Sequence, residues 1–308
     1  MGTDPSSTGR MSAGWRRALN VLGLAVMRVL ARLPLPWVRA LGWGLGHVLH
    51  VVAARRRRIA LVNWGLCFPG QPAAVAAQAV RQHFVYFAQA WLDRSWLWHA
   101  SPAKVQARLT LVGDTEVFQN ANPLVLLAPH FVGLDAGWTA LTMGVARRFS
   151  TIYAAQLNPD VDRWIQTGRL RFGSPHLVPR HKGVRPVVAA LRAREPLYLL
   201  PDMDYGPDDS VFVPFFGVQA ATVPSLSRLA HLSHAQVVPV VAHLTPQGYT
   251  VRVLPAWAAY PTGDALADTT LMNQRLEALI AQAPEQYFWV HKRFKSRPPG
   301  APPVYGRD

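Results

Sequence analysis

A histidine and a carboxylate stand close together near the middle of the chain. His130 directly follows an apolar run at 123–128, and Asp135 comes five residues later. A carboxylate that accepts the Nδ1 proton fixes the tautomer of an imidazole and leaves Nε2 free to take a proton from a hydroxyl. Gly133 would let the chain turn tightly between them. We therefore predict that His130 and Asp135 are catalytic, the alternative being a histidine that caps a helix end.

The sequence offers no obvious nucleophile for a covalent intermediate. It contains no Gly-x-Ser-x-Gly elbow, and its one cysteine, Cys67, lies far from His130 along the chain. A single thiol can neither form a disulfide within the chain nor build a cysteine-rich metal site. These features favour a general base over a covalent intermediate.

Short apolar runs that alternate with helical patterns must position His130. The runs predicted as strands are 109–112, 123–128, 150–153, 196–200, 211–216, 237–243 and 249–254. Helices are predicted at 73–98, 134–147, 161–172, 184–193, 223–232 and 268–282. This alternation is typical of a parallel sheet covered on both faces, whose ligands bind at the carboxyl ends of the strands. We therefore predict an α/β fold with a mixed, largely parallel central sheet flanked by helices.

The chain before this domain is both apolar and basic. Residues 15–68 are rich in Leu, Val, Ala and Trp, but arginines and prolines interrupt them before the ~20 apolar residues of a transmembrane helix accumulate. Four arginines recur at spacings that would place them on one side of a helix: Arg17, Arg28, Arg32 and Arg39. A stretch without formal charge at 40–54 ends in the run Arg55–Arg58. The pattern predicts helices that associate with an anionic membrane surface. The alternative is two helices of a soluble core followed by a solvated charge run.

The chain as a whole carries a large positive charge. Its 308 residues include 32 Lys and Arg against 17 Asp and Glu, a formal net charge of +15. Such a balance predicts attraction to nucleic acid, to an anionic membrane, or to acidic or phosphorylated substrates. The length fits one α/β domain at 69–299 after the helical region at 15–68, with a flexible leader at 1–14 and a flexible tail at 300–308.

Several sequence blocks carry a resemblance to a known family. The segment 130–135 looks like the His-x-x-x-x-Asp signature of glycerolipid and lysophospholipid acyltransferases. Over 15–299 the chain more specifically resembles the late, acyl-carrier-protein-dependent acyltransferases of lipid A biosynthesis. The further blocks occur in the family's order: NWGLCFP at 63–69, GRLR at 168–171, PDMDYGP at 201–207, SVFVPFFG at 210–217, AAT at 220–222 and PEQYFWVHKRFK at 284–295. The chain departs from many lipid A members in having Asp135 where they have Glu.

The resemblance implies a reaction and its participants. A thioester of acyl carrier protein would donate an acyl chain to a hydroxyl of a lipid A precursor, with no cofactor and no metal. His130 would act as the general base, and Asp135 would hold it. Arg169 and Arg180 are the candidates for binding phosphate or sugar acid groups of the acceptor, since guanidinium binds such anions bidentately. The enzyme would act at the cytoplasmic face of the bacterial inner membrane.

The unit Asp202-Met203-Asp204 follows the predicted strand at 196–200, and both acids are assigned to substrate binding. The same unit resembles the Asp-x-Asp metal site of some glycosyltransferases. A tight turn in which the acids accept bonds from backbone amides is the interpretation we favour over a metal. The Phe-rich end of 211–216 is predicted to line an acyl pocket.

Other functions remain as alternatives. The chain could acylate another lysophospholipid or glycolipid, bind nucleic acid or a membrane through its basic residues, or serve as a non-catalytic membrane adaptor. Its basic residues cluster beside apolar helices, and no recognised nucleic-acid module is present. We therefore predict acyl carrier protein, a lipid A precursor and an anionic membrane as partners, and not nucleic acid.

Overall fold

The strand that leads to His130 is buried on both of its faces. All four residues of β2 (Leu124–Leu127) are fully buried. Leu124 and Leu126 pack into a cluster with α6 (Leu134–Gly144), whereas Val125 and Leu127 pack into a cluster with α8 (Arg185–Arg192) and α9 (Ser225–Ser233). Successive side chains of a strand point to opposite faces, so an unbroken apolar run places β2 inside the sheet, between two layers of helices.

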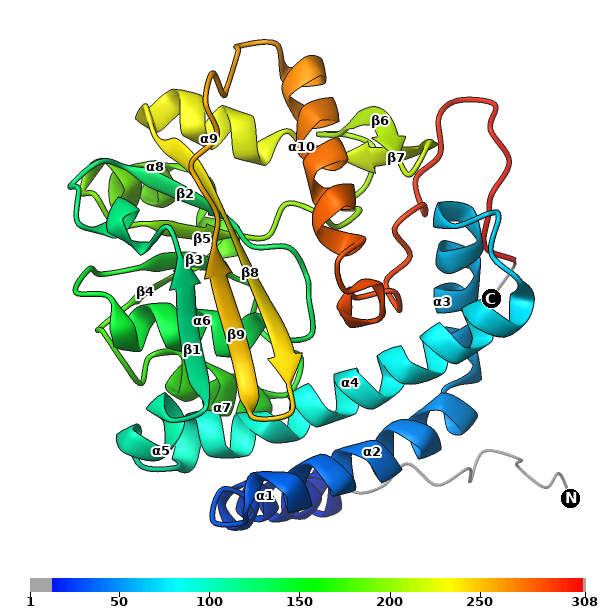
Figure 1. Ribbon diagram of the computed structural model, residues 1–308, viewed down its shortest axis with the longest axis vertical. Coiled ribbons are helices and arrows are strands. Elements are labelled where there is room, and N and C mark those ends of the chain that lie inside the picture. The colour runs from blue at the N-terminus through cyan, green and yellow to red at the C-terminus, as the bar shows by residue number, and fades with distance from the viewer. Residues whose placement is uncertain (1–12, 307–308) are drawn as a thin grey trace, which may run out of the picture.

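A computed structural model describes residues 13–306, and seven strands form its main sheet in the order β1-β9-β8-β2-β5-β3-β4 (Figure 1). Besides β2 they are β1 (Leu109–Gly113), β3 (Ser150–Tyr153), β4 (His176–Pro179), β5 (Leu197–Leu199), β8 (Gln236–Thr245) and β9 (Gly248–Val253). Only the β8–β9 pair is antiparallel. The prediction of a mixed, largely parallel sheet flanked by helices is confirmed.

One predicted strand lies outside this sheet. β6 (Val211–Phe215) pairs antiparallel with β7 (Val218–Thr222), which the sequence pattern missed, and the two form a separate hairpin. The hairpin packs against α10 (Ala265–Ile280), where Glu277 accepts a bond from the amide of Phe216 at 2.7 Å. The remaining elements are α5 (Pro102–Gln106), α7 (Pro159–Arg169) and the short helices η1 (Thr115–Phe118), η2 (Arg180–Lys182) and η3 (Pro284–Gln286).

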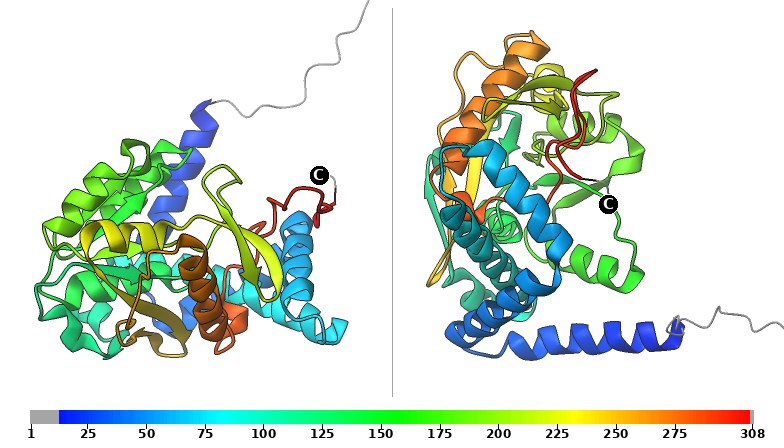
Figure 2. Two further views of the ribbon diagram at one scale, coloured as in Figure 1. Left: turned by 90° about the horizontal axis from the view of Figure 1, so that it is seen from above. Right: turned by 90° about the vertical axis from the view of Figure 1, so that its right-hand side faces the viewer.

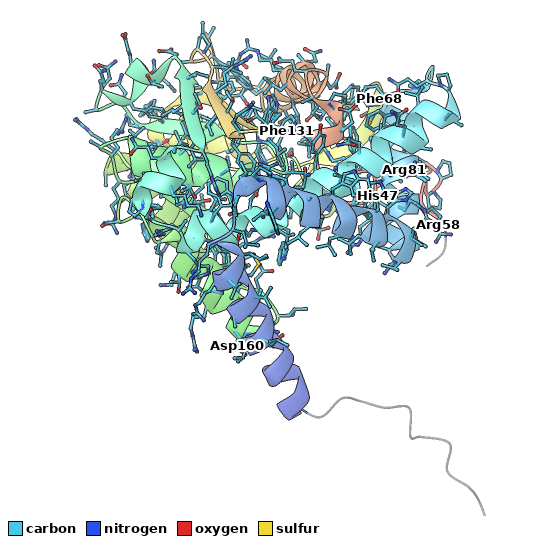
Figure 3. All side chains as sticks on the ribbon, turned by 60° about the horizontal axis from the view of Figure 1, so that its bottom comes forward. His47, Arg58, Phe68, Arg81, Phe131 and Asp160 are labelled. Atoms are coloured by element: carbon cyan, nitrogen blue, oxygen red, sulfur yellow. The ribbon has the colours of Figure 1, made fainter. Side chains whose placement is uncertain are left out.

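Three N-terminal helices precede the long helix α4 (Ala73–His99). They are α1 (Ala13–Leu30), α2 (Leu35–Val52) and α3 (Ala54–Cys67). α2 lies along α4, while α1 extends away from the body in both views of Figure 2. Figure 3 brings this side of the molecule forward, with His47 and Arg58 marking the far end of α2 and the start of α3. Within residues 13–306, no helix is both long enough and apolar enough to cross a bilayer.

The spacing predicted that Arg39 lies on the basic side of these helices, but this prediction is wrong. Arg39 is buried and pairs with Asp93 of α4 at 3.0 Å, and Tyr249 of β9 donates to the same carboxylate at 2.7 Å. Arg28 and Arg32 are exposed as expected, whereas the side chain of Arg17 lies outside the described residues. A buried carboxylate needs such partners, so α2 is tied through α4 to the sheet.

The two chain ends also differ from the predicted boundaries. Residues 1–12 of the predicted leader lie outside the described residues, and residues 13 and 14 already belong to α1. Near the other end, Tyr305 packs against the core cluster that contains Trp289, and its hydroxyl bonds to Asn63 of α3 and to the amide of Phe294. The predicted free tail from residue 300 is therefore wrong at Tyr305, because an aromatic side chain with two hydrogen-bond partners anchors it.

We predict that the packing of α2 on α4 depends on its glycines. A Cβ at Gly46 would lie 2.5 Å from the Cα of Val85, whereas a Cβ at Gly44 would meet nothing within 4 Å. Gly46→Ala should therefore lower the free energy of unfolding by about 1–3 kcal/mol through overpacking. Gly44→Ala should raise it by up to about 1 kcal/mol, because alanine favours a helix. Thermal unfolding of both variants in the same detergent tests the contrast, and equal shifts would contradict it.

Candidate active site

A pocket of about 1050 Å³ opens at the carboxyl ends of the central strands. His130 follows β2, Leu200 follows β5 and Tyr153 ends β3, and all three line it. This is the edge at which ligands of such sheets were expected to bind. Most of its wall is apolar or aromatic, with side chains that include Phe87, Trp91, Trp138, Ile152, Leu229 and Phe288.

The imidazole of His130 is bound to Asp202. Its Nδ1 lies 2.7 Å from Oδ1 of Asp202, and its backbone amide donates to Oδ2 of the same carboxylate at 2.9 Å. The two residues meet because β2 and β5 are neighbours in the sheet and Leu127 pairs with Leu199 in their register. Each residue stands three positions beyond its strand partner, so the register of one strand pair places both groups.

The charge of Asp202 fixes the proton on His130. Burial by itself would raise the pKa of Asp202, but attraction to His130 and hydrogen bonds from its ring and amide lower it. An ionised carboxylate can only accept, so Nδ1 must carry a proton. The imidazole side chain is 23% exposed and forms part of the pocket wall, while Asp202 is fully buried. Nε2 is therefore the ring nitrogen that remains for a molecule in the pocket.

The turn that carries Asp202 is held by the C-terminal segment. Asp204 accepts bonds from the amides of Gly206 at 2.9 Å and Ser296 at 2.7 Å. The Asp204 amide in turn donates to Nε2 of His291 at 3.1 Å. Burial, followed by the nearby charges of His130 and Arg293, lowers the pKa of His291 to about 4, so its ring is neutral and can accept this bond.

These contacts correct two predictions about the acidic unit. Neither Asp202 nor Asp204 lies in the pocket wall, so neither is placed to contact a substrate directly. Asp204 accepts backbone amides within a turn, as the favoured interpretation expected. Nowhere among the described residues do three or more His, Cys, Asp or Glu side chains gather so that they could hold a metal ion.

Asp135 does not hold His130, contrary to the prediction. It lies in the first turn of α6, where Arg94 Nε donates to Oδ2 at 2.7 Å and Arg169 Nε donates to Oδ1 at 2.8 Å. Burial would raise the pKa of Asp135, but the two guanidinium groups outweigh it and lower the pKa to about 2. Spacing along the chain could not reveal these partners, which come from α4 and α7.

The Arg94–Asp135–Arg169 cluster gives the pocket wall a net positive charge. All three residues line the pocket beside His130, and two guanidinium groups share one carboxylate. Arg180, the other predicted anion-binding residue, lines the same pocket and lies over the ring of Tyr205 at 4.3 Å. The structure therefore brings Arg169 and Arg180 into one cavity with His130.

Gly133 matters through close packing rather than through an unusual backbone angle. Its φ is −78°, which any residue can adopt. A Cβ there would collide with the carbonyl oxygen of Ala242 in β8. A glycine at this position thus lets the chain after His130 pass against the sheet and begin α6 at once.

The predicted acyl-pocket aromatics lie elsewhere. Phe215 and Phe216 pack with Phe294 and Trp289 in a core cluster and do not line the pocket. Cys67 belongs to the same cluster, and burial raises the pKa of its thiol, so no thiolate is available there. The aromatic wall of the pocket instead comes from α4, α6, β3 and β5, together with Phe131, Tyr205 and Phe288.

Sequence reasoning missed Arg94 altogether and gave Asp202 a different role. Arg94 lies within the long predicted helix, where an arginine reads as a surface residue. The sequence did indicate that Asp202 could lie near His130, because each of them follows a strand. What the sequence did not reveal is that the two strands are neighbours.

Known proteins are similar to this chain over nearly its whole length. The family model for bacterial lipid A biosynthesis acyltransferases matches residues 11–296. The lipid A biosynthesis lauroyltransferase of Escherichia coli K12 is 35% identical over 93% of this chain and 94% of its own length. The palmitoleoyltransferase of the same strain is 31% identical over 93% and 94%, and its myristoyltransferase is 31% identical over 93% and 90%.

We predict that Asp135 stabilises the protein in a pH-dependent way. Its pKa lies below the unfolded value of 3.8, so its contribution is present above that pH and is lost as the pH falls through about 2. Asp135→Asn should cost about 3 kcal/mol of unfolding free energy near neutral pH, because two arginines lose their buried partner. About 2 kcal/mol of this difference should disappear between pH 4 and pH 2.

Chemical denaturation across that pH range tests the prediction. Asp160→Asn is the matched control, because Asp160 lies in the first turn of α7 and forms no ion pair within residues 13–306. Its replacement should cost at most about 1 kcal/mol. A cost for Asp135→Asn no larger than that of the control would contradict the structural role of the cluster.

Proposed function

The chain belongs to the bacterial lipid A biosynthesis acyltransferases, and we propose that it transfers a fatty acyl chain from a thioester of acyl carrier protein to a hydroxyl of a lipid A precursor. The observation that supports this most is the His130–Asp202 pair, which presents one ring nitrogen to a large apolar pocket. The names of the relatives support the acceptor, since each is called a lipid A biosynthesis acyltransferase of one acyl specificity.

His130 is the general base in this proposal. Nε2 takes the proton of the acceptor hydroxyl while the oxygen attacks the thioester carbonyl, and Asp202 stabilises the imidazolium that forms. The tetrahedral intermediate then expels the thiolate as the carbon–sulfur bond breaks, and His130 returns the proton to the sulfur. A base so positioned contributes about 10²- to 10⁴-fold in rate. No cofactor enters this balance.

The pocket suits the two kinds of group that must meet at His130. Its aromatic and aliphatic wall offers burial to a hydrocarbon chain, at roughly 0.8 kcal/mol for each buried CH₂. The cationic side chains Arg169 and Arg180 offer partners for phosphate or sugar acid groups of the acceptor. Asp135 neutralises only part of the local charge, so the wall beside His130 also favours the oxyanion of the tetrahedral intermediate.

The N-terminal helices would hold the enzyme on the cytoplasmic face of the inner membrane. Trp37, Leu41, Val48 and Val52 of α2 are each more than half exposed. The opposite side of α2 packs closely on α4 through Gly42 and Gly46, so the large apolar side chains face outward. The arginines at 55–58 follow at once, as expected at anionic headgroups. The acceptor lipid would then reach the pocket from the same surface.

A transfer assay tests the reaction and its base together. Membranes containing the wild type should move labelled acyl groups from acyl carrier protein to a lipid A precursor. His130→Ala and Asp202→Asn should each lose about 10²-fold or more of kcat, the second because an amide does not stabilise the imidazolium. Asp114→Asn, outside the pocket lining, should match the wild type. Undiminished transfer by His130→Ala would exclude it as the base, whereas transfer only to a lysophospholipid would replace the proposed acceptor.

Vesicle binding tests the membrane surface. Leu41→Glu combined with Val48→Glu places two charges on the exposed side of α2, which should reduce partitioning to anionic vesicles by about tenfold or more. Leu266→Glu is the control, because Leu266 is similarly exposed at 54% but lies on α10. Flotation of the three proteins with anionic and zwitterionic vesicles gives the comparison. Equal losses in both variants would mean that α2 is not the membrane contact.

A further inference from the structure

The mouth of the active-site pocket is formed by residues that both line it and are exposed. Arg180 of η2 and Val184 form one part of this rim, and Arg228 and Leu232 of α9 form another. Val184 is 51% exposed and Leu232 49% exposed. Large apolar side chains left half open at a pocket mouth, beside two arginines, are the kind of contact that protein interfaces use.

Beyond this rim lies a ridge of unbalanced positive charge, which we call the α8 ridge. It consists of Lys182, Arg185 and Arg192, all exposed. Lys182 and Arg185 flank the rim residue Val184, and Arg192 follows Arg185 by seven residues, about 10 Å further along the same side of α8. No acidic residue occurs from 180 to 194. The first one, Glu195, lies 3.6 Å from Arg148 and 3.4 Å from His176.

The rim itself is close to neutral. Asp208 and Asp209 line the pocket as well and are exposed, so they offset Arg180 and Arg228. None of the three ridge side chains has a hydrogen bond or an ion pair within the described part of the chain. The ridge charge is therefore available to a partner, whereas the charge at the rim is largely balanced.

The helix that carries most of the ridge lies far from the surface proposed to contact lipid. α8 and α9 lie at the top of the molecule in Figure 1, and α1 and α2 lie at the bottom. The right-hand view of Figure 2, which keeps the vertical axis of Figure 1, shows the same separation. A partner that binds the ridge while α1 and α2 rest on a bilayer must approach from the aqueous side.

We propose that the α8 ridge is the docking surface for the acidic carrier protein, which presents its acyl thioester across Val184 and Leu232 to His130. The inference rests on the proposed function and adds where the donor binds. Charge complementarity selects an acidic partner and speeds its encounter, and the half-exposed apolar pair supplies a contact at the point of entry. Donor and acceptor would then reach the same pocket from opposite sides.

Kinetics of the whole enzyme with a varied concentration of acyl carrier protein test the docking surface. Lys182→Glu combined with Arg185→Glu should raise the KM for the carrier by about tenfold or more while kcat is unchanged, because these residues bind and do not react. Adding Arg192→Glu should raise the KM further. The KM of the wild type should rise with ionic strength, and that of the variants should respond less.

The matched control carries the same change in charge elsewhere. Arg252→Glu combined with Lys295→Glu reverses two exposed cations, one on β9 and one in the C-terminal segment. Its KM for the carrier should stay within about twofold of the wild type, since charges beyond a Debye length are screened. A small acyl-pantetheine donor, which cannot reach the ridge, reports whether each variant has folded with an intact site. A carrier with acidic residues changed to Lys should recover affinity for the ridge variant.

The possible results distinguish a wrong docking surface from a wrong acyl donor. If the wild type uses the carrier and the ridge variant has an unchanged KM, or if the control loses as much, the docking surface is wrong and the reaction stands. If the wild type transfers only from the small donor, the carrier is not the donor and the ridge assignment falls with it. If the ridge variant loses vesicle binding rather than carrier affinity, the ridge contacts lipid instead.

Discussion

The pairing of β2 with β5 is the constraint on which the site depends. Leu127 opposite Leu199 places His130 and Asp202 at matching positions beyond the two strands, where a single carboxylate binds both the ring and the amide of the histidine. A slip of one residue would turn every side chain of β2 to the other face, and close packing against two different helical layers opposes such a slip. Packing in the sheet therefore sets the geometry of the His130–Asp202 pair.

Asp135 and Asp202 are both buried carboxylates near the pocket, but they have different structural roles because their neighbours differ. Asp202 is surrounded by the turn and by His130, so it orients a ring and fixes a tautomer. Asp135 lies between Arg94 of α4 and Arg169 of α7, so it joins the helices that form the pocket wall. Chemical type alone does not distinguish these two roles. The spatial neighbours of each carboxylate decide which it performs.

The sequence predicted most of the elements but not which of them are neighbours. Strands such as β2 and β8 can be recognised in the sequence because burial on both faces requires an unbroken apolar run. The sequence analysis did not predict β4 (His176–Pro179), because only one of its four residues is fully buried and its apolar pattern is weak. The sheet order brings β5 beside β2 although β3 and β4 lie between them in the chain, so spacing favoured Asp135 over Asp202. Arg39 was misplaced for a similar reason, since its partner Asp93 belongs to another helix.

The arrangement of surfaces around the pocket follows from the same fold. Glycines bring one side of α2 against α4, which leaves its large apolar side chains exposed at one end of the molecule. The crossover helix α8 packs its apolar residues on the sheet, which leaves its arginines outward near the other end. Between them the strands deliver His130 to a cavity whose wall is apolar with a cationic patch. For the proposed reaction, this division would let a membrane lipid and a donor from the aqueous phase reach the same pocket from different surfaces.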